Sequence, residues 1–121
     1  MKDINSLKIN QNAIIIDAIR IISTTRFRCL LVIGENDKFL GVLSEGDILR
    51  AISNGTNIYS SISNLYRKDF KYLTKKDNSK ALNLFKQFGI TLIPIVDKYL
   101  NIIEIFTLDE ILEFIKFEDS E

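Results

Sequence analysis

Hydrophobic and polar positions along the first half of the chain predict a strand, a helix, two further strands and a second helix. Apolar residues at positions 14, 15, 18, 19 and 22 fall on one helix face, and the run from Arg28 to Ile33 is apolar and β-branched, typical of a buried strand. Asn12 is expected to cap the first helix and Asn54-Gly55 to end the second. The predicted elements are strand 7–9, helix 13–22, strand 28–33, strand 39–43 and helix 44–53.

The second half repeats this order. Residues 70–73 predict a strand, and apolar positions 81, 82, 84, 85 and 88 predict a helix capped by Asn78 or Ser79 and ended by Gly89. Two more strands follow at 92–96 and 102–106, and Thr107 is expected to cap a last helix that continues to about residue 115. Residues 56–69 between the halves predict a polar connector with one helical turn at 62–65.

The two halves match in register as well as in order. Ser44 and Thr107 are 63 residues apart, and so are the acids that follow them, Asp47 and Glu110. Apolar positions match apolar positions at the same offset: Ala18 and Ala81, Ile22 and Phe85, Val32 and Ile95, Leu49 and Leu112, Ile52 and Ile115. The pattern predicts an α/β fold of two βαββα repeats, residues 4–55 and 70–116, joined by the connector 56–69. Each repeat is near the lower size limit for a stable core, so we expect the repeats to bury their sheets against each other about a pseudo-twofold axis.

Composition removes several classes of function. The 121 residues carry 16 basic and 16 acidic side chains, so no strong field for nucleic acid or an anionic membrane is expected. The absence of histidine and the single cysteine, Cys29, exclude a Ser-His-Asp triad and a Cys/His zinc site. The chain has no P-loop, no signal-peptide core and no apolar run long enough to span a membrane. One unpaired cysteine fits a reducing cytoplasm.

The strand-to-helix motif Gly41-Val42-Leu43-Ser44-Glu45-Gly46-Asp47-Ile48, the doubled register and the strand Ile93-Pro94-Ile95-Val96-Asp97 together resemble a tandem pair of CBS (cystathionine-β-synthase) domains. The resemblance covers roughly residues 4–116. The stretch from Ser44 to Ile52, with Asn54-Gly55, is also similar to CBS pairs at the N-terminus of bacterial sugar-phosphate nucleotidyltransferases. The resemblance implies a non-catalytic regulatory module, attached to or partnered with such an enzyme, and a homodimer formed through helix faces.

The resemblance also implies a ligand and a site. The expected ligand is an adenosyl compound, AMP, ADP, ATP or S-adenosylmethionine, bound in the cleft between the repeats, with no required cofactor and no metal. Asp47 is expected to accept hydrogen bonds from the ribose hydroxyls, and Ser44 to favour a phosphate at a helix N-terminus. Side chains near Cys29 and Pro94 are expected to enclose the adenine. The candidate binding residues are Ser44, Asp47, Arg28, Cys29, Thr107, Glu110 and Pro94, with Arg26 and Lys75 as further phosphate contacts.

A second interpretation needs no ligand. Ser44-x-x-Asp47 and Thr107-x-x-Glu110 both have the form of a capping box, which a helix after a strand requires in any case. The chain is then a structural dimerisation module, with Phe114, Ile115 and Phe117 as a helix face for a partner. Glu110 and Glu104 depart from the aspartate and glycine of the motif, which makes a second ligand site doubtful. The basic residues Arg67, Lys68, Lys75 and Lys76 are interpreted as solvated connector charges.

Overall fold

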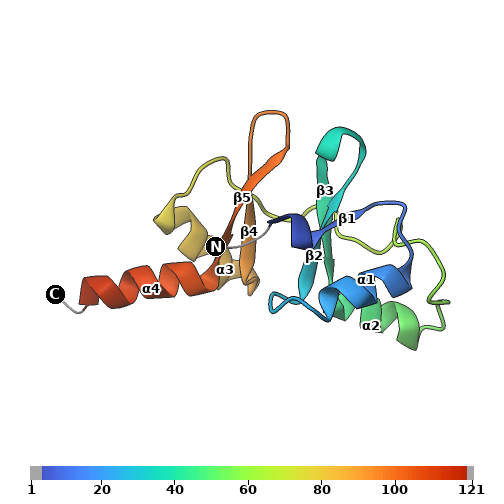
Figure 1. Ribbon diagram of the computed structural model, residues 1–121. Coiled ribbons are helices and arrows are strands. Elements are labelled where there is room, and N and C mark those ends of the chain that lie inside the picture. Colours follow the sequence, from blue (N-terminus) through green and yellow to red (C-terminus); the bar gives the residue numbers. More distant parts are fainter. Residues whose placement is uncertain (1–3, 120–121) are drawn as a thin grey trace. The chain divides into compact units, whose positions relative to one another are not determined.

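The computed structural model describes the backbone of residues 4–119 and the side chains up to residue 115. The chain divides into two compact units, residues 1–70 and 71–121, and each is described here by itself (Figure 1). Each unit contains antiparallel strands joined by a tight turn and flanked by helices, as the α/β prediction requires. No helix in the described part of the chain has both the length and the apolar character needed to cross a bilayer.

The first unit contains a three-stranded sheet in the order β1-β2-β3. β1 runs parallel to β2, because α1 connects them, and β2 pairs antiparallel with β3. Its elements are η1 (Ile4–Leu7), β1 (Lys8–Asn10), α1 (Ile15–Ile22), β2 (Cys29–Ile33), η2 (Glu35–Asp37), β3 (Phe39–Ser44) and α2 (Glu45–Ser53).

The second unit contains α3 (Asn78–Phe88), β4 (Leu92–Val96), β5 (Ile102–Thr107) and α4 (Leu108–Asp119). β4 and β5 form an antiparallel pair. The predicted strand at 70–73 is wrong as a strand, because only Leu73 pairs, in a single parallel bridge to Ile95. Its neighbour Tyr72 is 46% exposed and Lys71 is charged, so little apolar surface is available to hold a longer strand against the sheet.

The predicted register is confirmed element by element. Each of α3, β4, β5 and α4 begins 63 residues after its counterpart α1, β2, β3 or α2. The strand pairings agree too: Cys29 pairs with Ser44 in the first unit, and Leu92 pairs with Thr107 in the second. An irregularity also falls at the same place in both hairpins, between Val32 and Ile33 and between Ile95 and Val96. The two units are therefore copies of one supersecondary structure built from different residues.

Each unit has an apolar core of its own. In the first, α1 buries Ile15 and Ala18 against Leu30 of β2 and Leu43 of β3. In the second, Phe85 of α3 meets Phe106 of β5 edge to face, with ring centroids 6.3 Å apart. The apolar face predicted for α1 is the one that is buried, whereas on α3 the buried part is Ala81 and Phe85, and Leu82 and Phe88 of the predicted face are exposed.

Helix starts are the least well predicted feature. α1 begins at Ile15 and not at residue 13, and the predicted cap Asn12 is wrong, because the N-cap is Ile14 and has no side-chain bond. The backbone there is fixed from outside the helix, since the N–H of Ile15 donates to the carbonyl of Ser60 over 2.9 Å. α3 is capped by Asp77, which accepts from the N–H of Lys80, and not by Asn78 or Ser79.

Helix ends agree better with prediction. Asn54 is the C-cap of α2. Gly89 ends α3 in the left-handed conformation at φ 63°, which glycine adopts without a Cβ penalty. α4 continues to Asp119, beyond the predicted end near residue 115.

The segment predicted as a polar connector belongs structurally to the first unit. Ile62 is fully buried in the core of that unit, and its N–H donates to the carbonyl of Ala13 over 2.9 Å. The predicted turn at 62–65 is present, because the N–H of Leu65 donates to the carbonyl of Ile62. Residues 58–67 therefore complete the unit and do more than link it to the next one.

We predict that Ile62→Ala lowers the free energy of unfolding of the first unit by about 2–5 kcal/mol, because it removes a fully buried aliphatic side chain and leaves a cavity. The exposed Tyr59 of the same segment provides the control, and Tyr59→Ala is expected to change stability by no more than about 0.5 kcal/mol. Urea unfolding followed by circular dichroism measures both. Equal effects of the two substitutions would show that the segment is only a tether.

Candidate functional site

The first motif lies where β3 passes directly into α2. Ser44 is both the last residue of β3 and the N-cap of α2. Its hydroxyl accepts a hydrogen bond from the backbone N–H of Asp47 over 3.1 Å, and the Asp47 carboxylate accepts one from the N–H of Ser44 over 3.0 Å. The capping box predicted for Ser44-x-x-Asp47 is therefore confirmed as the local structure.

Asp47 has two arginine partners beyond the capping box. Its side chain is only 8% exposed, and Oδ1 accepts from Nη2 of Arg50 over 2.6 Å and from Nε of Arg67 over 3.4 Å. Burial acts to raise the pKa of Asp47, but the hydrogen bonds from Ser44 and the positive charges of Arg50 and Arg67 outweigh it and hold the pKa below its ordinary value. Asp47 is an ionised, buried and almost fully coordinated carboxylate.

Arg67 reaches Asp47 because its backbone is held against β3. The N–H of Val42 donates to the carbonyl of Arg67 over 3.0 Å, and the N–H of Arg67 donates back to Val42 over 2.9 Å. A Cβ on Gly41 would collide with the carbonyl oxygen of Arg67, so the glycine of the motif is needed for this close approach. Arg67 is exposed, in agreement with its interpretation as a solvated charge, but the fold also pairs it with the motif acid, which that interpretation did not include.

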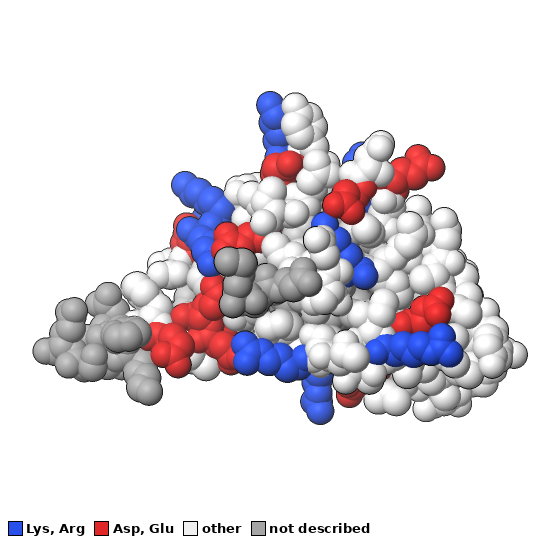
Figure 2. Space-filling model, viewed as in Figure 1, with Lys and Arg blue, Asp and Glu red and all other residues white. Residues whose placement is uncertain are grey.

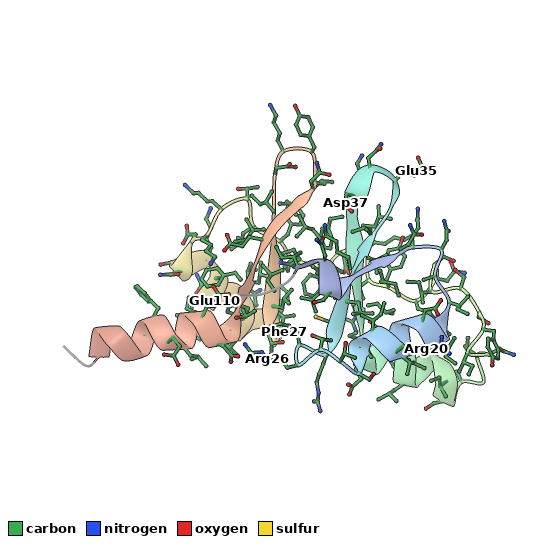
Figure 3. All side chains as sticks on the ribbon, viewed as in Figure 1. Arg20, Arg26, Phe27, Glu35, Asp37 and Glu110 are labelled. Atoms are coloured by element: carbon green, nitrogen blue, oxygen red, sulfur yellow. The ribbon has the colours of Figure 1, made fainter. Side chains whose placement is uncertain are left out.

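Arg28 lies on the other side of the α2 N-terminus. Its carbonyl accepts the N–H of Glu45 over 2.9 Å, and its backbone adopts a left-handed conformation at φ 59°. The guanidinium is 78% exposed, and its Nε lies 3.9 Å from Oε2 of Glu45. Arg26, two residues earlier in the loop before β2 (labelled in Figure 3), stacks over Phe27 at 5.1 Å from the ring centroid.

Cys29 follows as the first residue of β2. It is buried and free, and burial raises the pKa of its thiol to about 11. A thiol with that pKa is neutral near pH 7, so Cys29 has the character of a small apolar residue and not of an activated nucleophile. Leu30 and Leu31, the next two residues of β2, are fully buried.

The second motif has a different set of partners. Thr107 is buried and ends β5, and its backbone N–H donates to Oε1 of Glu110 over 3.4 Å. Glu110, on the first turn of α4 in Figure 3, also accepts from Nζ of Lys76 over 2.9 Å. The same ammonium lies 2.8 Å from Glu104 and 5.3 Å from the centroid of the Phe106 ring. Lys76 is exposed, in agreement with its interpretation as a solvated charge, but it is also paired with two glutamates.

The remaining candidates are simple to place. Pro94 lies in β4, where every residue is buried, and its carbonyl accepts the N–H of Leu73 over 3.0 Å. Lys75 is exposed. On the face shown in Figure 2, basic and acidic side chains are interspersed. Among the described residues, no group of three or more His, Cys, Asp or Glu side chains is placed to hold a metal ion.

Three residues of the site are missing from the sequence prediction: Arg50, Arg67 and Lys76. The position of Arg50, three residues after Asp47 on a helix, is a spacing at which side chains meet, so the sequence contains this signal. Arg67 is 20 residues from Asp47, and Lys76 is 34 residues from Glu110, so neither pairing can be read from local spacing.

We predict that Asp47→Asn lowers the free energy of unfolding by about 1–3 kcal/mol at pH 7, because it removes a buried charged acceptor from two arginines. The folded-state pKa is below the unfolded value of about 3.9, so the wild-type contribution is complete above the unfolded pKa and disappears as the pH falls through the folded pKa. Urea unfolding at pH 3 and pH 7 measures the difference between wild type and variant, which should be larger at pH 7.

The exposed pair of Asp17 and Arg20, 3.5 Å apart on α1, provides the control, and Asp17→Asn should change stability by less than about 0.5 kcal/mol. A wild-type-to-Asp47→Asn difference that is the same at both pH values would contradict the assignment of a coordinated carboxylate.

Comparison with known proteins places the strand-to-helix motif of the first unit within a known family model. Residues 1–54 match the family model of the CBS domain. Over 108 residues the chain is 29% identical to the homoserine O-acetyltransferase of Methanobrevibacter ruminantium, covering 88% of this chain and 21% of the relative. It is 27% identical over 106 residues to the L-aspartate semialdehyde sulfurtransferase of Methanosarcina acetivorans, covering 85% of this chain and 20% of the relative. The chain spans about a fifth of the length of these relatives.

Solved structures share the fold at low sequence identity. A CBS domain protein from Pyrobaculum aerophilum complexed with AMP matches with a TM-score of 0.77 and 15% identity, covering 92% of this chain and 91% of that one. The cytosolic domain of the Mg²⁺ channel MgtE in complex with ATP matches with a TM-score of 0.76 and 18% identity, covering 89% of this chain and 44% of that one. The chain thus has the fold of a CBS pair, and its first 54 residues match the CBS domain family.

Proposed function

We propose that the chain is a non-catalytic regulatory module that binds an adenosyl ligand, AMP, ADP, ATP or S-adenosylmethionine, at Ser44 and Asp47. The observation that carries the proposal is the buried, ionised Asp47 carboxylate next to the Ser44 hydroxyl at the start of α2. Such a carboxylate is a strong acceptor for ribose hydroxyls, and hydrogen bonds to a charged acceptor are worth about 1.5–3 kcal/mol. The fold shared with proteins solved in complex with AMP and ATP supports the same ligand class.

The other candidate residues are proposed to contact the phosphate and the base of the ligand. Arg28 offers an exposed guanidinium for phosphate, and Cys29 an apolar surface for the base. The participation of Pro94, Thr107 and Glu110 from the second repeat stays a prediction, as does the division of the chain into repeats 4–55 and 70–116. Glu104 and Glu110 stand where the motif of the first unit has a glycine and an aspartate, so we propose that the working site is the one around Asp47 and that the stoichiometry is one ligand per chain.

We propose that the ligand regulates by binding two conformational states of the module with different affinities. It shifts the equilibrium between these states only as far as its affinities for them differ, and the shift changes the activity of an attached or partner enzyme. The relatives that carry enzyme names and exceed this chain in length support an enzymatic partner. The similarity of residues 44–52 to CBS pairs of sugar-phosphate nucleotidyltransferases makes such an enzyme the specific candidate. A free, buried cysteine fits our placement of the module in a reducing cytoplasm.

Isothermal titration tests the proposal. AMP, ADP, ATP and S-adenosylmethionine are titrated into the purified chain, with GTP and CTP as controls for the base. We expect micromolar binding of at least one adenosyl ligand at one site per chain, and a loss of affinity of about tenfold or more in Asp47→Ala. Asp17→Ala, which removes an exposed carboxylate from α1, should leave affinity unchanged.

Melting curves establish that Asp47→Ala is folded at the titration temperature, and Asp47→Asn serves as a gentler second variant. Absence of binding by every adenosyl ligand, or equal affinity in wild type and both folded variants, would overturn the proposed site.

A dimerisation module is the second candidate, and exposed apolar side chains at repeated positions support it. Leu49 is 57% exposed and Ile52 is 39% exposed, three residues apart on α2. Leu112, 63 residues after Leu49, is 52% exposed on α4, next to the half-buried Ile115. Phe114 of the predicted helix face is also exposed, and the side chain of Phe117 lies outside the described residues. Apolar side chains exposed to water at the same position of both units are unfavourable, and a homodimer interface would bury them.

We predict that the chain is a homodimer in solution and that Leu49→Lys weakens the dimer about tenfold or more, because it places a charge in an apolar interface. Tyr59→Lys, at an exposed aromatic residue outside the helices, is the matched control and should have no effect. Sedimentation equilibrium gives the mass and the dissociation constant. A monomer at all concentrations up to about 100 μM, which corresponds to weak association, would exclude this function.

A further inference from the structure

The Asp47 carboxylate is close to its limit as an acceptor. Oδ2 accepts from the backbone of Ser44, and Oδ1 accepts from both Arg50 and Arg67. An ionised carboxylate offers about four acceptor positions, so these three donors leave about one. A ribose that donates from both of its hydroxyls therefore needs one of the present donors to leave.

Arg67 is the donor that can leave. Its Nε lies 3.4 Å from Oδ1, whereas Nη2 of Arg50 lies 2.6 Å away and belongs to the same helix as Asp47. The Ser44 N–H is part of the capping box and is fixed by the backbone. The Arg67 side chain is 61% exposed and can move, while its backbone stays bonded to Val42. The Arg50 side chain is equally exposed, so the distance decides: the longest of the three bonds is the one that a ligand breaks at least cost.

A displaced guanidinium needs a new anion nearby. The charged side chains around the start of α2 are Arg28, Arg50 and Arg67 against Glu45 and Asp47, which is three positive charges against two negative ones. The Arg50 guanidinium lies over the first turn, since a Cβ on Gly46 would be 3.3 Å from its Nη1 and 3.7 Å from Oγ of Ser44. A phosphate attached to the ribose would meet these guanidinium groups, which bind phosphate through paired hydrogen bonds.

We infer that Arg67 selects an anionic adenosyl ligand. When the ribose hydroxyls bind the Asp47 carboxylate, the Arg67 guanidinium leaves that carboxylate and binds the ligand phosphate instead. The inference rests on the proposed function and narrows it: AMP, ADP and ATP are ligands of this site, whereas adenosine lacks the phosphate and S-adenosylmethionine brings a positive sulfonium to a cluster that is already cationic. Arg67 is then a specificity-determining residue, four positions before the start of the second unit at Lys71.

Titration of adenosine, AMP, ATP and S-adenosylmethionine into wild type, Arg67→Gln and Lys68→Gln tests the inference. Wild type should bind AMP and ATP about tenfold or more tightly than adenosine and S-adenosylmethionine. Arg67→Gln should weaken AMP and ATP about tenfold, while adenosine keeps its affinity or binds more tightly, because its ribose no longer competes with a guanidinium. Lys68→Gln removes the same charge from the adjacent residue and should leave the ratio of AMP to adenosine affinity within about twofold.

The change in adenosine affinity caused by Arg67→Gln shows whether Arg67 selects for the phosphate or only stabilises the structure of the site. Equal weakening of adenosine and AMP by Arg67→Gln would overturn the inference, and so would a wild type that does not distinguish phosphorylated from unphosphorylated ligands; the proposed adenosyl site survives either result. Failure of every adenosyl ligand to bind overturns both. Arg67→Lys keeps the positive charge but lacks the planar guanidinium, so it should restore part of the ratio of AMP to adenosine affinity. Such a partial recovery would show that the loss in Arg67→Gln does not come from misfolding.

Discussion

The strand-to-helix junction without a loop is the constraint on which the rest of each unit depends. β3 ends at Ser44 and α2 begins at the next residue, so the free N–H groups of the first helical turn must find acceptors within a few ångströms of the sheet. Ser44 supplies one acceptor and the carbonyl of Arg28 another, and in the second unit the carbonyl of Thr91 accepts the N–H of Leu108 in the same way. The hairpin, the helix and the preceding loop are held in place by this one set of bonds.

The same bonds leave Ser44 and Asp47 at the place proposed for the ligand, so capping and the proposed binding are compatible interpretations of one motif. A carboxylate that only capped a helix would face water on its outer side. Asp47 instead faces two arginines and is almost completely buried. In the second unit a single lysine satisfies two glutamates, one of them at the position where the first unit has Gly41. In both copies the acid of the motif accepts the backbone N–H of the residue that ends the strand, while the charges around the acid have diverged.

Almost all of the architecture can be predicted from the sequence. The pattern repeats at a fixed offset, so the elements predicted in one half can be compared with those predicted in the other. Ser44, Asp47 and Gly89 take the local roles predicted from their residue types, since caps and left-handed ends depend on neighbours in the chain. Asn12 fails because a distant backbone, that of Ser60, fixes the start of α1. The partners of Arg67 and Lys76 are missed for the same reason: the fold supplies these partners, and a charged residue in a polar segment gives no local sign of them.

The incorporation of residues 58–67 into the first unit has a consequence for synthesis on the ribosome. When Ser53, the last residue of α2, has been added, the sheet and both helices of that unit exist in the chain, but Ile62, which completes its core, and Arg67, which neutralises Asp47, do not. At translation speeds of about 5–20 residues per second, the nascent unit waits roughly a second for its last piece. During that interval the Asp47 carboxylate lacks one of its two counter-charges and the apolar core lacks Ile62, so the unit cannot reach its final stability before residue 67 has been added.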